Sequence, residues 1–145
     1  MGVGAGCGTE DNRPAEWSFI APVIMTPNCA TASCHSSGAA VSGLDFSTPE
    51  RGYESLVDLN ATSFYESENP AKVTRPLVNP CRPDQSRIIS MMRARGAQRM
   101  PPDRPMSQAD IELVEQWILN GARKNPDDKD PCLVPANMAG TGGTP

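Results

Sequence analysis

Apolar residues recur along this 145-residue chain at the three-to-four-residue spacing of an α-helix, in four separate stretches. No stretch shows the strict alternation of apolar and polar residues that is typical of a half-buried β-strand. Strong breakers separate the stretches, so each expected helix is short. The four helical stretches lie at about residues 15–26, 48–59, 84–95 and 107–120. The pattern therefore predicts an all-α fold of about four short helices.

Several of these helices begin with a recognisable capping residue. Ser47 or Thr48 is expected to cap the second helix, because Pro49 follows as a suitable first helical residue. Asp84 is the expected cap of the third helix. Ser107 precedes the clearest apolar stripe in the chain, so we expect it to cap the last helix.

The domain boundaries follow from local composition. Residues 1–14 are rich in glycine and then polar, which predicts a flexible tether. Residues 125–145 are charged and then rich in Gly, Thr and Pro, which predicts a disordered tail. One domain is expected over residues 15–124. Inside it, Pro22 is expected to interrupt the first helix and Pro27 to close it, because proline lacks a backbone N–H.

Composition narrows the class of protein. The chain has 15 prolines and 12 glycines, which predicts long proline-rich loops such as residues 60–83. Aromatic residues make up only 5% of the chain, so a bulky apolar cofactor would help to fill the core. The net charge of −4 and the lack of a basic run argue against a nucleic-acid partner. No apolar run approaches the roughly 18 residues that span a membrane.

The most informative stretch is residues 28–36. Cys29 and Cys34 are separated by four residues, and the only histidine of the chain, His35, follows directly. A Cys…Cys-His run is typical of haem c attachment, in which two thiols bond to the haem vinyl groups and the histidine binds the iron. The usual spacer has two residues, so this spacer is a departure. A plain Cys29–Cys34 disulfide in a haem-free chain is the alternative.

A second iron ligand is expected among the methionines, because the chain contains no second histidine. Met100 is the best candidate. Pro101 and Pro102 follow it and fix the backbone, which limits the entropy cost of holding a weak iron–sulfur bond. Met106 is the next candidate. For either residue, the alternative role is a gap-filling core side chain.

Two further features bear on a bound cofactor. Residues 36–43 are small, so their backbone is able to lie against a flat ligand, and a solvated loop is the alternative. Arg99 and Arg104 are candidates to pair with a haem propionate, although exposed arginines are more often simply solvated.

Three cysteines remain outside the motif. Cys81 and Cys132 form a candidate disulfide, which would indicate an oxidising compartment, and two unrelated thiols are the alternative. Cys7 follows Gly4-Ala5-Gly6 in a way similar to the end of a bacterial lipoprotein signal. A lipid anchor at Cys7 is therefore one expectation, and an unpaired tail cysteine is the other.

Over about residues 19–122 the chain resembles the class I cytochromes c, and more narrowly the cytochrome c-like domains of bacterial secreted and lipid-anchored proteins. The resemblance rests on motifs in a fixed order: Cys-His at 34–35, Gly-Leu-Asp-Phe-Ser at 43–47, Pro-Asp-Gln-Ser at 83–86, Met-Pro-Pro at 100–102 and Trp-Ile-Leu-Asn-Gly-Ala at 117–122. It implies a small all-α cytochrome c-like fold wrapped around one covalent haem c. It also implies thioether bonds at Cys29 and Cys34, His35 as the proximal iron ligand and Met100 as the distal one.

Together these features predict a monohaem c-type cytochrome that carries single electrons. It is not expected to be an enzyme, because two protein ligands leave the iron no open position. We expect it in the periplasm or cell envelope, secreted or lipid-anchored, with redox partners whose basic patches complement its negative charge. The alternative is a haem-free or ligand-sensing cytochrome-like binding module of a cell-envelope lipoprotein.

Overall fold

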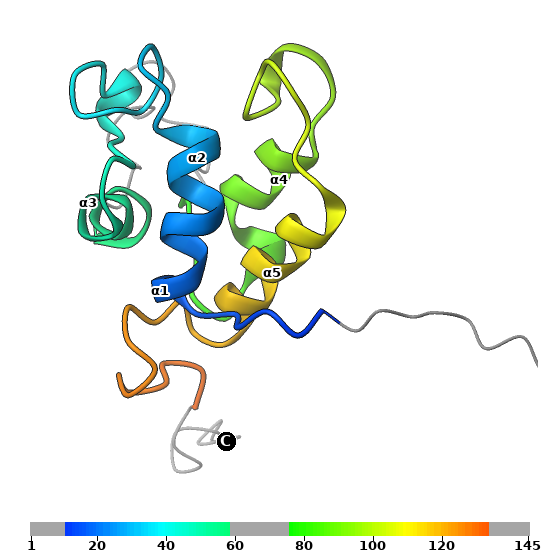
Figure 1. The fold of residues 1–145 in the computed structure, drawn as a ribbon. Helices are drawn as coiled ribbons and strands as arrows, with labels where there is room; N and C mark the ends of the chain where they lie inside the picture. The colour runs from blue at the N-terminus through cyan, green and yellow to red at the C-terminus, as the bar shows by residue number, and fades with distance from the viewer. Residues whose placement is uncertain (1–10, 59–75, 134–145) are drawn as a thin grey trace, which may run out of the picture.

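The computed structural model describes residues 11–58 and 76–133, and over these residues the chain forms helices and no β-strand. The all-α expectation is confirmed at this level. Figure 1 shows a central helical rod with later helices packed on both of its sides. Residues 1–10, 59–75 and 134–145 lie outside the described part of the chain, and with them most of the expected tether, much of the expected long loop and the end of the tail.

The rod consists of three helical segments that follow one another without a break: α1 (Trp17–Ile20), η1 (Ala21–Met25) and α2 (Thr26–Cys29). The middle segment is a π-turn, in which the Thr26 N–H bonds to the Ala21 carbonyl five residues earlier. At Pro22 the α-helix gives way to the π-turn without a break, and the rod ends at Cys29, one residue beyond the expected close at Pro27 and Asn28. Each proline lies in the first two positions of a new helical segment, where a missing N–H removes no bond of that segment.

The second helix, α3 (Pro49–Tyr53), continues directly into a second π-turn, η3 (Glu54–Asp58). It begins where the sequence predicts, because the Thr48 hydroxyl accepts a backbone N–H of the first turn at 3.3 Å. The indole N–H of Trp17 donates to the Pro49 carbonyl at 2.8 Å. This bond joins the start of α3 to the rod.

The third helix departs from the expected start. A 3₁₀ turn, η4 (Pro83–Gln85), precedes the helix α4 (Arg87–Arg93), so Asp84 lies in the turn and Ser86 occupies the capping position. Ser86 is fully buried, and its hydroxyl accepts the Asn79 N–H at 2.8 Å instead of capping α4. The cap at Asp84 is therefore a wrong prediction, because the buried hydroxyl fixes this turn from inside the fold.

The last helix, α5 (Gln108–Leu119), agrees with the sequence. The Ser107 hydroxyl accepts the Asp110 N–H at 3.1 Å, as a helix cap does. Its apolar stripe is buried, and its outer side forms an ion pair from Glu115 to Arg93 of α4. Asp110 also pairs with Arg13, which brings the start of the described chain against α5.

An aromatic cluster joins the beginning and the end of the fold. The rings of Trp17 and Trp117 lie 4.9 Å apart between centroids, and Tyr53 meets Trp17 edge-on at 5.8 Å. The Tyr53 hydroxyl donates to the Ala122 carbonyl at 2.9 Å. The core therefore holds the rod, α3 and α5 together. Its other buried apolar residues include Ile20, Ile24, Leu56, Ile89, Ile111, Val114 and Ile118.

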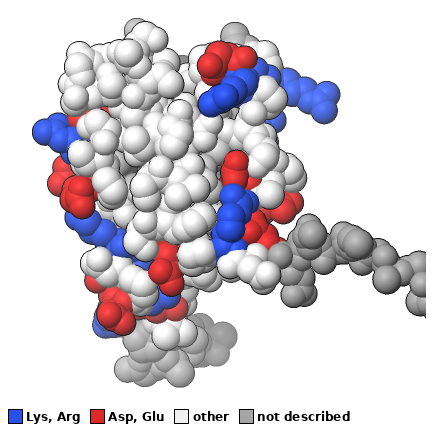
Figure 2. All heavy atoms as spheres, in the orientation of Figure 1, with Lys and Arg blue, Asp and Glu red and all other residues white. Residues whose placement is uncertain are grey.

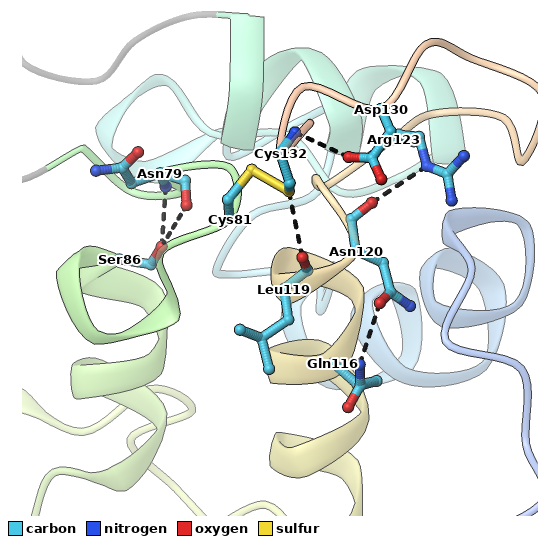
Figure 3. Close-up of a disulfide and its surroundings, with 9 residues drawn as sticks. All are labelled: Asn79, Cys81, Ser86, Gln116, Leu119, Asn120, Arg123, Asp130 and Cys132. Carbon is cyan, nitrogen blue, oxygen red and sulfur yellow. Dashed lines mark hydrogen bonds between the residues drawn. A yellow bond between two sulfur atoms is a disulfide. The ribbon is translucent and has the colours of Figure 1, made fainter. Parts of the chain in front are cut away.

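A disulfide closes the C-terminal side of the fold (Figure 3). Cys81 and Cys132 are bonded, with 2.12 Å between their sulfur atoms, in agreement with the candidate pair from the sequence. The Cys81 N–H also donates to the Ile118 carbonyl at 2.8 Å. The segment after α5 is thus returned to the turn that precedes α4.

Two short 3₁₀ turns, η2 (Val41–Gly43) and η5 (Gly96–Gln98), belong to loops at one end of the molecule. Figure 1 shows these loops on either side of α2. In Figure 2, which has the same orientation as Figure 1, the surface that covers the rod and η2 is largely uncharged, and charged side chains lie at its margins. Among the described residues, no helix is both long enough and apolar enough to cross a membrane.

Candidate functional site

A cavity of about 480 Å³ lies at this end of the molecule. It is bounded by the end of the rod, by the loop that follows it, and by α4 together with the loop before α5. The side chains around it are mostly apolar. The residues proposed from the sequence for haem attachment and iron binding all line this one cavity: Cys29, Cys34, His35, Met100 and Met106.

The two cysteines of the motif lie on the rod side of the cavity. Cys29 is the last residue of α2, and the loop that follows returns so that the His35 N–H donates to the Cys29 carbonyl at 3.1 Å. Within the loop, the Cys34 N–H donates to the Thr31 carbonyl at 2.9 Å. The four-residue spacer thus forms a closed turn that leaves both thiols at the cavity.

Both thiols are free in the structure, and neither is bonded to the other. Burial raises the pKa of the Cys29 thiol to about 12, and the neighbouring Cys34 adds to the increase. The thiolate is the form that attacks a disulfide, so the raised pKa lowers the reactivity of the Cys29 thiol. The Cys29–Cys34 disulfide considered from the sequence is not formed here.

His35 is held in one orientation by a backbone contact. Its Nδ1 atom lies 3.0 Å from the Val41 carbonyl oxygen. A carbonyl oxygen only accepts hydrogen bonds, so Nδ1 carries a proton, and in the neutral imidazole the lone pair is then on Nε2. The Phe46 ring meets the imidazole edge-on at 5.5 Å between centroids. The arrangement leaves Nε2 as the nitrogen able to bind a metal.

The small-residue loop after His35 is a defined turn. The Val41 N–H donates to the Cys34 carbonyl at 3.0 Å, and the Ala40 N–H donates to the Ser36 carbonyl at 2.8 Å. Ala40 and Ser42 both take positive φ angles, 37° and 58°. Most of residues 36–43 are exposed, and of them Val41 lines the cavity, so contact of this loop with a flat ligand stays a prediction.

Methionine side chains occur on several sides of the cavity. All five methionines that the structure describes line the cavity: Met25, Met91, Met92, Met100 and Met106. Met25 and Met92 are buried in the core, which suits the packing role. Met100 is 37% exposed and stands on the loop after η5. That loop is tied to α4, because the Met100 N–H donates to the Met91 carbonyl at 3.1 Å.

The two arginines proposed from the sequence make protein contacts. Arg99 donates from Nε to the Pro101 carbonyl at 3.2 Å and from Nη2 to the Pro102 carbonyl at 3.1 Å. Arg104 reaches the Asn28 side-chain oxygen at 3.5 Å. Neither arginine lines the cavity. Their pairing with a propionate stays a prediction.

Sequence reasoning missed several residues of the site. Val41 supplies the carbonyl that orients His35, and Asn28 and Asp103 also line the cavity. Asp103 contributes the one carboxylate among the described lining residues. A pattern of side chains does not reveal that a backbone carbonyl is a partner of His35. Phe46 lies in the Gly-Leu-Asp-Phe-Ser motif, so the sequence could have indicated it as a residue of the site.

Comparison of the chain with protein-family models, curated proteins and solved structures finds no match. The function must therefore be argued from the site. Two free thiols, an imidazole with Nε2 available and a thioether loop surround a mostly apolar cavity within the usual size range of ligand pockets. These groups suit a large apolar cofactor that takes two covalent bonds and two axial ligands.

Proposed function

We propose that this chain is a monohaem c-type cytochrome that carries single electrons. Haem c would be attached through Cys29 and Cys34, with His35 and Met100 as the axial ligands of its iron. One observation carries the proposal: both thiols, the imidazole and the Met100 thioether line the same cavity, although Met100 lies 65 residues after His35 in the sequence. When bound, the haem supplies the one-electron ferric–ferrous couple.

The hydrogen bond to Val41 supports His35 as the proximal ligand. Its donor is Nδ1, so Nε2 is available without a change of tautomer. The same bond makes the imidazole a stronger donor to a metal. Phe46 restricts rotation of the ring from the side. His35 is therefore prepared as a ligand by residues of its own loop and the following segment.

The apolar wall supports an electron carrier with a raised potential. Met25, Leu56, Leu77 and Met92 are buried and line the cavity, so they would give a bound haem apolar surroundings. A histidine and methionine ligand pair raises the reduction potential, and a dry site acts in the same direction because it disfavours the more charged state. Two protein ligands also leave no open position for a substrate.

A second candidate function follows from the exposure of Met100. Its side chain is 37% exposed, while Met25 and Met92, also in the cavity wall, are almost fully buried. A thioether at the cavity edge is able to yield to a small external ligand, which would make the protein a haem-based sensor. Carbon monoxide separates the two functions: the electron carrier should bind it poorly in the ferrous state, whereas a sensor should bind it readily.

The disulfide supports a place in the cell envelope. A Cys81–Cys132 bond persists in oxidising compartments such as the bacterial periplasm. The acidic excess, 17 Asp and Glu against 13 Lys and Arg, supports redox partners that carry basic patches. The lipid anchor proposed at Cys7 lies outside the described residues and stays a prediction.

The decisive experiment is to produce the protein in a host that attaches haem c and to record its absorption spectrum in both redox states. We expect a Soret band that stays with the protein through acid–acetone extraction, because thioether bonds survive this treatment. The matched control is the double variant Cys29→Ser/Cys34→Ser, which should lose the band on extraction. A wild-type protein that also loses its Soret band would exclude the cytochrome.

A further inference from the structure

Hydrogen bonds hold the backbone at Met100 and at the two prolines that follow it. Pro101 and Pro102 have no N–H, so Met100 supplies the only backbone donor of this three-residue segment. That donor goes to the Met91 carbonyl at the end of α4. The carbonyls of the two prolines remain, and neither can be satisfied by a helix or a sheet.

Arg99 binds both of these carbonyls with one guanidinium group. Nε donates to the Pro101 carbonyl at 3.2 Å and Nη2 to the Pro102 carbonyl at 3.1 Å. The guanidinium is planar and rigid, so two donors on successive carbonyls fix the direction of the chain between them. The backbone N–H of Arg99 donates to the Gly96 carbonyl at 3.1 Å, which joins Arg99 to η5. Among the described residues, no ion pair involves Arg99.

We infer that Arg99 is a positioning residue for Met100: its two-pronged contact holds the Met-Pro-Pro turn so that the thioether stays directed at the cavity. The inference rests on the proposed function. Arg99 does not line the cavity itself, so it acts through the backbone of the residues that do. The Fe–S(Met) bond is weak, and a stiff loop keeps the thioether in place without a large loss of entropy on binding.

Arg95 provides a matched control before η5. It carries the same charge, is exposed, and lies four residues before Arg99, outside the lining of the cavity. Removal of either arginine changes the net charge equally. An effect of charge alone would therefore appear in both variants, whereas an effect of losing the two hydrogen bonds to the proline carbonyls would appear only at Arg99.

The test uses the haem-loaded protein and the variants Arg99→Ala, Arg99→Lys and Arg95→Ala. The first readout is the ferric charge-transfer band that marks a methionine ligand, followed as the pH is raised. In Arg99→Ala we expect the band to be lost about one pH unit lower, a tenfold change in the displacement equilibrium. Arg99→Lys keeps the charge but not the fork, so it should restore only part of the difference.

The second readout is hydrogen exchange at the Met100 amide, which does not depend on a ligand band. Exchange should be about tenfold faster in Arg99→Ala than in the wild type and unchanged in Arg95→Ala. Unchanged exchange and an unchanged band profile in both Arg99 variants would overturn the inference, as would equal effects in Arg95→Ala. A further outcome is a wild type that lacks the methionine band while exchange is still faster in Arg99→Ala. This outcome would support the role of Arg99 in holding the loop and would exclude Met100 as the iron ligand. If Arg99→Ala does not fold, Arg99→Lys decides between these outcomes.

Discussion

The Nδ1 atom of His35 lies 3.0 Å from the carbonyl oxygen of Val41, six residues further along the chain. This contact fixes the tautomer of the only histidine in the protein. The turn that brings Val41 there places Ala40 and Ser42 at φ angles of 37° and 58°, a left-handed region that L-residues with a Cβ rarely occupy. The turn that orients the imidazole therefore contains local backbone strain.

Replacing Ala40 with glycine should stabilise the protein by about 0.5–1 kcal/mol, because relief of the left-handed conformation outweighs the added freedom of glycine in the unfolded chain. The measurement is the free energy of unfolding by chemical denaturation. Ala39→Gly is the matched control: Ala39 has no positive φ, so this change should destabilise by a similar amount. Equal effects at the two positions would show that the strain is not stored at Ala40.

A second prediction concerns Asp45, which precedes the phenylalanine that packs on His35. The Ser47 N–H donates to Asp45 Oδ1 at 2.9 Å, and Arg51 donates to Oδ2 at 3.0 Å. These contacts, with the Ser47 bond foremost, lower the pKa of the Asp45 carboxyl. A lowered pKa in the folded state gives stability that is present above the unfolded pKa of about 4 and is lost as the pH falls through the folded value.

Asp45→Asn should therefore lower the melting temperature at pH 7, and the difference from the wild type should shrink as the pH falls below about 4. Thermal unfolding followed by circular dichroism at pH 7 and at pH 3 measures this. Glu112→Gln, which removes an exposed carboxylate of α5, serves as the control and should change little at either pH. A constant difference across the pH range would mean that Asp45 acts through shape and not through its charge.

Local signals made the capped helices predictable. Ser107 and Thr48 cap their helices with their own hydroxyls, and such contacts span only three residues of sequence. The buried stripe of α5 follows from its helical spacing in the same way. The Cys29, Cys34 and His35 group was also visible, because it is contiguous.

Contacts that depend on tertiary structure were not predictable. Pro22 and Pro27 read as breakers, but the packed rod changes its helical register at each of them and continues. Asp84 read as a cap, but the buried hydroxyl of Ser86 determines the turn. The Val41 carbonyl is a backbone partner, and a backbone group leaves no mark in a pattern of side chains.

The Cys81–Cys132 disulfide gives a third prediction. It closes a loop with a sequence separation of 51 residues, so the loss of unfolded-state entropy corresponds to about 4 kcal/mol in the chain-entropy account. Cys81→Ser/Cys132→Ser should lower the free energy of unfolding by about 2–4 kcal/mol. In the wild type, alkylation without reduction should leave both cysteines unmodified in the intact mass. Labelling of both residues before reduction would show that the bond is absent in solution.

The last prediction separates the two methionines that the sequence left as candidate ligands. Met100 and Met106 both line the cavity, but their surroundings differ. Met106 packs against the hydrophobic core, whereas Met100 is 37% exposed on a loop held by Arg99 and by the Met91 carbonyl. Binding to iron requires a sulfur atom that is free to reach the cavity, whereas core packing requires a buried side chain. Truncation of Met100 should therefore affect mainly iron binding, and truncation of Met106 mainly stability.

In the haem-loaded protein, Met100→Ala should abolish the ferric charge-transfer band of a methionine ligand, because it removes the sulfur that would bind the iron. Met106→Ala should keep the band and cost about 1–2 kcal/mol, because it leaves a gap beside the core. Absorption spectra and denaturation curves of both variants give the two quantities. Persistence of the band in Met100→Ala together with its loss in Met106→Ala would transfer the ligand role to Met106.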